Sequence, residues 1–362
     1  MTGLRSACSL SLLALGMICL VGGVSAGLAR LAWDVPLATA AGWHGALMIS
    51  AFFGAVISLE RAVAVGRGWA YLAPACAGLG GVLLLAGVPH ASAQILLSAA
   101  AAILVIGSAV VIGRLAALFT FVLATGALCW LIGNLVWTAE DAVTAAVPWW
   151  LCFLILTVAA ERLELTRFLP TPVTARRLFV AIVGAIFAGA ALGLWVDDLG
   201  LRLFSFGLAA LAVWLMRYDI ARINVRQKGL TRFIAVCLLL GYCWLVAAGL
   251  LGLKGAFLAG HPWRDAALHA IGLGFVFSMV LGHAPVIVPA VTRLKLPYHA
   301  VFYLPLLLLH ASLTLRVVGV VCENFALRRY GGLANACALL IFISVVVSGI
   351  VRGRLQKGVR AV

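Results

Sequence analysis

The stretch Ala91–Ile112, ASAQILLSAAAAILVIGSAVVI, contains no charged residue and consists almost entirely of apolar or small side chains. A helix of about 20 such residues, rising ~1.5 Å per residue, crosses the hydrocarbon layer of a membrane. Irregular backbone exposed to lipid is excluded because its N–H and C=O groups would lack partners. This stretch therefore predicts a transmembrane α-helix, and similar stretches recur along the chain.

The composition indicates that a lipid bilayer is the solvent of the whole chain. Of the 362 residues, 65% are hydrophobic and 10% are charged, which excludes a water-soluble fold with a polar exterior. We expect an all-α polytopic bundle of about 12 spans that forms one integral membrane domain over residues 1–362. The expected spans are residues 7–30, 37–60, 69–88, 91–112, 115–138, 145–163, 178–196, 199–216, 233–255, 265–290, 299–320 and 332–351.

The formal net charge of +15 predicts orientation rather than nucleic-acid binding, because the basic residues recur in alternate loops. By the positive-inside rule, these loops and both ends, Met1 and Val362, face the cytoplasm of a bacterial inner membrane. Arg328 and Arg329 are the exception, since they fall on the opposite, outer side. The basic loops and tail contain Arg61, Arg67, Arg114, Arg162, Arg167, Arg176, Arg177, Arg217, Arg222, Arg226, Lys228, Arg232, Arg293, Lys295, Arg352, Arg354, Lys357 and Arg360.

Four carboxylates lie at cytoplasmic ends of spans beside arginines, and none lies at mid-membrane depth. Interfacial ion pairs that fix the helix ends and a proton entry point both remain open for them. The acids are Glu60, Glu161, Glu164 and Asp219, beside Arg61, Arg162, Arg167 and Arg217.

Five of the seven histidines lie in or at the ends of three expected spans. His44 and His269 are expected about 9 Å below the outer surface, at ~1.5 Å per residue, and His310 near mid-depth. We expect these three to converge in one outer pocket, and His283 and His299 to form an inner group. Neutral imidazole binds haem iron and copper, so all five are candidate metal ligands.

Three arginines near the outer ends of spans suit the propionates of a haem, because guanidinium pairs well with carboxylate. They are Arg30, Arg264 and Arg316. With His44, His269 and His310 they form the predicted cofactor site.

The segment Gly282–Pro285, followed by Pro289, predicts an interruption of the helix near the cytoplasmic end of the expected span 265–290. Such an interruption can line a binding cavity or can be a simple kink.

Two segments, Trp43–Met48 (WHGALM) and Arg264–Ala270 (RDAALHA), resemble the two signature segments of the NnrS family. Members of that family are polytopic bacterial membrane proteins of about twelve spans, regarded as haem- and copper-containing and linked to nitric oxide and denitrification stress. The resemblance implies an arrangement loosely related to the catalytic subunit of haem-copper oxidases. The family typically has a second histidine and a glutamate where this chain has Ala46 and Leu47, so haem is implied more strongly than copper.

The resulting expectation is a haem-binding membrane redox protein connected with nitric oxide or denitrification-type stress and served by a respiratory-chain or other electron-donor protein. Whether copper is a second cofactor stays open. Two alternatives remain open. One is a secondary transporter, which would suit the span number and the interrupted helix. The other is a non-catalytic assembly or metal-handling partner of a respiratory complex.

Overall fold

All regular elements are helical in the computed structural model, which describes residues 2–167 and 169–359. Within this part, 12 helices are long and apolar enough to cross a membrane, which confirms the predicted all-α polytopic bundle. The ends Met1 and Val362, predicted to face the cytoplasm, lie outside the described residues. The spans are Cys8–Ala29, Ala46–Val65, Gly68–Leu85, His90–Arg114, Leu118–Glu140, Val143–Thr166, Val173–Leu192, Asp197–Tyr218, Gly229–Leu253, Arg264–Thr292, Ala300–Val321 and Phe325–Gly353.

The chain divides into two compact units, unit 1 (Met1–Glu161) and unit 2 (Arg162–Val362). The single membrane domain expected from the sequence stays a prediction. Unit 1 contains α1 (Thr2–Ala29), η1 (Ala38–Trp43), η2 (Ala46–Phe53), α2 (Gly54–Val65), η3 (Gly68–Tyr71), α3 (Leu72–Leu85), α4 (His90–Arg114), α5 (Leu118–Glu140) and most of α6 (Val143–Thr166). Unit 2 contains α7 (Val173–Leu192), α8 (Asp197–Tyr218), α9 (Ala221–Asn224), α10 (Gly229–Leu253), α11 (Arg264–His269), η4 (Ala270–Phe277), α12 (Ser278–Thr292), η5 (Ala300–Phe302), α13 (Tyr303–Val321) and α14 (Phe325–Val359).

Unit 1 is held together at membrane depth by a fully buried polar hub around Asn134 of α5. The Asn134 Oδ1 atom accepts hydrogen bonds from Ser50 Oγ of η2 at 2.8 Å and from Trp150 Nε1 of α6 at 2.9 Å. Its Nδ2 donates to the carbonyl of Leu97 in α4 at 2.8 Å, and Trp130 Nε1 donates to Ser50 Oγ at 2.8 Å. Because water is absent from the hydrocarbon layer, these groups satisfy one another and fix the register of four helices.

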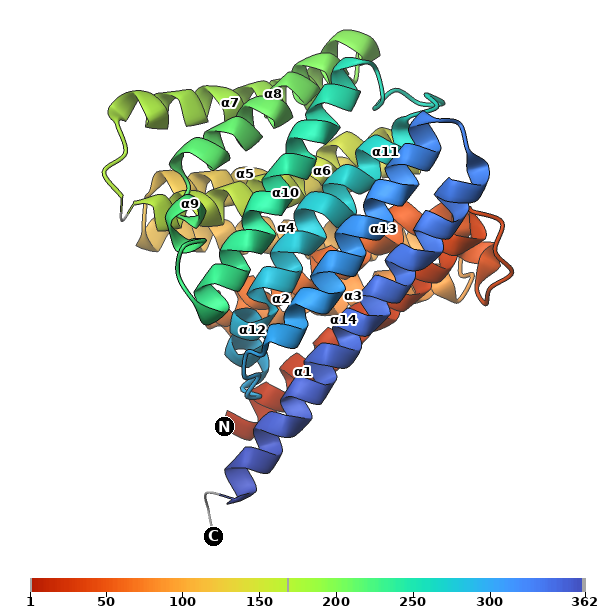
Figure 1. The fold of residues 1–362 in the computed structure, drawn as a ribbon. Coiled ribbons are helices and arrows are strands. Elements are labelled where there is room, and N and C mark those ends of the chain that lie inside the picture. Colours follow the sequence, from red (N-terminus) through yellow and green to blue (C-terminus); the bar gives the residue numbers. More distant parts are fainter. Residues whose placement is uncertain (1, 168, 360–362) are drawn as a thin grey trace. The chain divides into compact units, whose positions relative to one another are not determined.

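Unit 2 is arranged around α10, which contacts α8 on one side and η4 with α12 on another. Figure 1 shows α10, the α11–η4–α12 span, α13 and α14 running side by side. The last two helices pack backbone to backbone: a Cβ at Gly331 of α14 would lie 2.6 Å from the backbone nitrogen of Arg316 in α13. Small residues at such contacts let membrane helices approach closely.

Most span ends lie within about five residues of the expected ones, and two spans differ in a way that affects the histidines. The second span begins as the 3-10 turn η1, and its regular part starts only at Ala46, so His44 precedes this part instead of lying inside it. The helix α12 continues through Pro285 and Pro289, so the chain is not broken there, and the kink that the sequence left open stays a prediction. The irregular part of that span is η4, a π-helical segment that begins directly after His269.

The Asn134 hub yields a prediction about stability. Replacing Asn134 by leucine should lower the free energy of unfolding by about 1–3 kcal/mol, because the buried donors of Ser50 and Trp150 and the Leu97 carbonyl lose their partner. Unfolding in detergent, followed by tryptophan fluorescence, measures this loss. The control is Ser108→Ala, which removes a hydroxyl bound only to the Leu104 carbonyl of its own helix and should change little. Equal stability of the Asn134→Leu variant and the wild type would contradict the role of the hub.

Candidate functional site

His44 in unit 1 is fixed against α1. Its Nδ1 atom lies 2.7 Å from the carbonyl oxygen of Gly23. A carbonyl only accepts hydrogen bonds, so in the neutral ring Nδ1 carries the proton and Nε2 carries the lone pair. A Cβ at Gly27 would lie 2.7 Å from His44 Cε1, so this glycine makes room for the ring. Histidines that bind metals through Nε2 are oriented in this way by a carbonyl on Nδ1.

His269 in unit 2 has the same tautomer as His44, fixed by a carbonyl of its own helix. Its Nδ1 atom lies 2.8 Å from the carbonyl oxygen of Asp265, one helical turn earlier. The lone pair of the neutral ring is therefore again on Nε2.

Each of these two histidines is followed by a π-helical segment. η2 begins two residues after His44, and η4 begins at the residue after His269. Such segments are rare in proteins, and those that occur often lie at functional sites. Apolar periodicity does not reveal them, because both segments read as ordinary span residues in the sequence.

His310 makes a different set of contacts. Trp244 Nε1 of α10 donates to its Nδ1 at 2.8 Å, and an indole can only donate. The Nε2 atom must then carry the proton, and it lies 3.1 Å from Ser278 Oγ of α12, which can accept it. Both ring nitrogens are thus used within unit 2, and the geometry favours a structural histidine that joins α10, α12 and α13.

His283 and His299, the expected inner group, have separate partners in unit 2. His283 Nδ1 lies 2.8 Å from the Met279 carbonyl, and its Nε2 lies 3.4 Å from the Arg162 guanidinium. His299 is exposed and precedes the span; its Nδ1 accepts from the backbone N–H of Val301 at 3.1 Å and caps η5.

The predicted propionate arginines of unit 2 have protein partners. Arg316 binds both oxygens of Asp265 through Nε at 2.9 Å and Nη2 at 2.8 Å. Arg264 Nη1 donates to the carbonyl of Phe257. In unit 1, Arg30 lies exposed just after α1.

A buried ion pair in unit 2 is the feature that the sequence reasoning missed. Asp219 is 0% exposed and accepts from Arg162 Nε at 2.7 Å and Nη2 at 3.2 Å, and Arg162 is 3% exposed. Tyr242 Oη and the backbone N–H of Ala221 also donate to the carboxylate, at 2.8 Å and 2.7 Å. The sequence order suggested Arg217 as the partner of Asp219, but α8 ends at Tyr218 and the chain turns the carboxylate inward.

The other carboxylates at these span ends form interfacial ion pairs, as one of the two open hypotheses expected. In unit 1 Arg61 pairs with Glu161 and, at 3.4 Å, with Glu60. In the other unit Arg167 lies 3.9 Å from Glu164, and both side chains are well exposed.

Metal sites made wholly of side chains would need several ligands in one place. Among the described residues, no three or more His, Cys, Asp or Glu side chains are grouped so that they could hold a metal ion. A haem brings four ligands of its own and needs only one or two from the protein, so a haem site does not require such a group.

The Asp219 network yields a second prediction. Arg162→Met or Asp219→Leu alone should lower the free energy of unfolding by about 3–5 kcal/mol, because each leaves one buried charge unpaired. The double variant should be less destabilised than either single variant, since it leaves neither charge. A double-mutant cycle of unfolding in detergent measures the coupling.

The control is Glu164→Gln, which breaks the exposed pair with Arg167 and should have almost no effect. Additive losses in the double variant would contradict a coupled ion pair.

Comparison with known proteins places the chain in a family. A comparison with curated proteins gives no significant match. The family model described as a domain of unknown function (DUF8744) matches residues 9–351. Because this match covers nearly the whole chain, the protein belongs to the DUF8744 family.

Proposed function

We propose that this protein is a haem-binding membrane redox protein, with His44 and His269 as haem ligands. The observation that carries the proposal is the shared geometry of these two imidazoles. Each donates from Nδ1 to a backbone carbonyl, and each stands at the start of a π-helical segment. Neutral imidazole with the lone pair on Nε2 is the form that binds haem iron.

The surroundings of His269 fit a flat macrocycle. A Cβ at Gly272, three residues further along η4, would meet no heavy atom within 4 Å, so space is open beside this part of the segment. The imidazole itself is held in place, which reduces the cost of orienting a ligand. When bound, a haem would supply an iron able to accept electrons and to bind a small molecule.

The ligand set proposed here is narrower than the set expected from the sequence. His310 accepts from Trp244, and its second nitrogen carries a proton, so it is proposed to support the fold. Arg316 is left out of the proposed haem site because its guanidinium donates to both carboxylate oxygens of Asp265. The link to nitric oxide, the electron-donor protein and the additional copper rest on the resemblance to the NnrS family.

A secondary transporter is the second candidate, favoured by the two π-helical segments, since transporters often bind substrates where spanning helices are irregular. Optical and metal analysis of the purified protein distinguishes the two candidates, because a transporter needs neither haem nor copper.

The haem proposal predicts a Soret absorption band for protein purified after expression with ample haem supply. His44→Ala and His269→Ala should each abolish or shift this band, because each removes a nitrogen from iron. His310→Phe should leave the band in place while lowering stability, because it removes hydrogen bonds to Trp244 and Ser278.

His90→Ala is the matched control. This histidine lies at the start of α4, and its Nε2 is 2.6 Å from Asp141 Oδ1, so its loss should not affect the band. Wild-type protein with no Soret band and no bound iron or copper would overturn the proposal and move the transporter to first place. Haem content per chain would also show whether the two histidines serve one haem or two.

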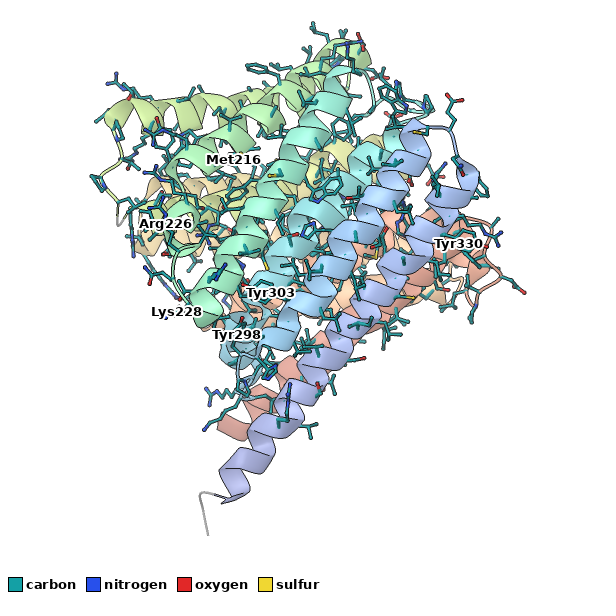
Figure 2. All side chains as sticks on the ribbon, in the orientation of Figure 1. Met216, Arg226, Lys228, Tyr298, Tyr303 and Tyr330 are labelled. Atoms are coloured by element: carbon teal, nitrogen blue, oxygen red, sulfur yellow. The ribbon has the colours of Figure 1, made fainter. Side chains whose placement is uncertain are left out.

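We further propose a bacterial inner-membrane location with both termini in the cytoplasm. The support is the basic end of unit 2, where Arg226 and Lys228 lie far from Tyr330 at the other end (Figure 2). Basic loops stay on the cytoplasmic side during insertion.

This orientation predicts that a phosphatase active only in the periplasm, fused after Val362, will be inactive. Fusion within the turn between α13 and α14, after Glu323, should be active, because an odd number of spans precedes it. The reverse pattern would contradict the orientation.

A further inference from the structure

Unit 2 contains a cluster of charged side chains at the end where α11 and α14 begin and α13 ends. It consists of Asp265, Arg316 and Arg328, and is called the Asp265 cluster below. Arg316 binds both carboxylate oxygens of Asp265, at 2.9 Å and 2.8 Å, and Arg328 Nε lies 3.4 Å from Oδ2. The Asp265 and Arg316 side chains are only 14% and 9% exposed, whereas that of Arg328 is 35% exposed.

The Asp265 cluster has more positive than negative charge. One carboxylate faces two guanidinium groups, and an arginine stays charged under all ordinary conditions. Arg316 already occupies both oxygens with well-aligned hydrogen bonds. The Nε atom of Arg328 is buried, and no described residue accepts a hydrogen bond from it. The cluster therefore has one more positive than negative charge, and the buried Nε of Arg328 forms an ion pair but no hydrogen bond with Asp265.

Close packing of two helices fixes the position of Arg328. A Cβ at Gly319 of α13 would overlap the backbone of Arg328, so the two helices meet here without space for a side chain. Arg328 lies near the N-terminal end of α14, where the helix dipole disfavours a cation, but also beside Gly319 near the C-terminal end of α13, where the dipole favours one. It also lies at the end of unit 2 that is poorer in basic residues. A second anion bound at this position would offset the excess positive charge of the Asp265 cluster.

We propose that the Asp265 cluster binds the phosphodiester of a membrane phospholipid. A phosphodiester has a single negative charge, which matches the single excess positive charge, and its two free oxygens fit the guanidinium fork. The Asp265 cluster lies where three membrane spans begin or end, which is the level of lipid headgroups.

Apolar side chains beside the Asp265 cluster provide a surface for acyl chains. Leu315 and Val318 of α13 and Phe325 of α14 are exposed. Tyr330 projects outward from the same end of α14 in Figure 2. A free phosphate ion would gain nothing from these contacts, so the structure favours a lipid as the source of the phosphate. This proposal does not depend on haem binding.

The test uses the delipidated full-length protein in detergent, without haem. It is titrated with dioctanoyl phosphatidylglycerol, and binding is measured by native mass spectrometry and by the shift of the melting temperature. We expect binding by the wild type and a loss of affinity of about tenfold in Arg328→Gln, the size expected for one charge-assisted hydrogen bond. Dioctanoylglycerol, which lacks the phosphate, should bind much more weakly. Inorganic phosphate should produce no comparable stabilisation.

Two further variants complete the test. Arg202→Gln is the matched control, because Arg202 is an arginine near the start of α8 that has its own partner in Asp198; it should bind the lipid like the wild type. Arg328→Lys keeps the charge without the fork and should bind at intermediate strength, which covers the case in which Arg328→Gln does not fold. Equal affinity of the wild type and both Arg328 variants would overturn the proposal. So would equal stabilisation by inorganic phosphate, or lipid binding that haem abolishes by competition.

Discussion

The backbone hydrogen bond is the interaction on which the rest of this structure depends. In the hydrocarbon layer no water is present to form hydrogen bonds with an unpaired N–H or C=O group. Each span must therefore pair its backbone N–H and C=O groups internally. The described part of the chain follows this rule with helices throughout. The few departures are therefore informative, and the π-helical segments η2 and η4 are the most prominent of them. They begin one or two residues after the histidines whose tautomers are fixed by carbonyls.

The same constraint governs the buried side chains. Asn134 in unit 1 and Asp219 in unit 2 each stand at the centre of a network in which donors and acceptors match. A half-satisfied network would be costly in a low dielectric, whereas a complete one specifies which helices meet and in which register. The Asp265 cluster differs from these two networks because its charges do not balance. That difference separates a candidate binding site from an element of the fold.

The histidines show why identity and depth alone do not define a site. His269 and His310 look similar in the sequence, since both lie in apolar spans and both were expected to line one outer pocket. In unit 2, Nδ1 of His269 donates to a carbonyl, so the lone pair of that ring is on Nε2. Nδ1 of His310 accepts from an indole, so the lone pair of that ring is on Nδ1. Such a distinction depends on one neighbour, Trp244, which is 66 residues away along the chain from His310. No periodicity in either helix encodes it.

The sequence by itself determined the span number and most span boundaries, because the length of apolar runs is set by bilayer thickness, a property outside the protein. It also offered interfacial ion pairs at the cytoplasmic span ends as one of two hypotheses, but not the pairing of Arg61 with Glu161, which lies 100 residues away. Only the tertiary structure decided which partner each buried group takes. Asp219 pairs with Arg162 and not with the nearby Arg217. A hydrogen bond needs donor and acceptor atoms about 3 Å apart, and the order of residues along the chain does not fix such distances between helices.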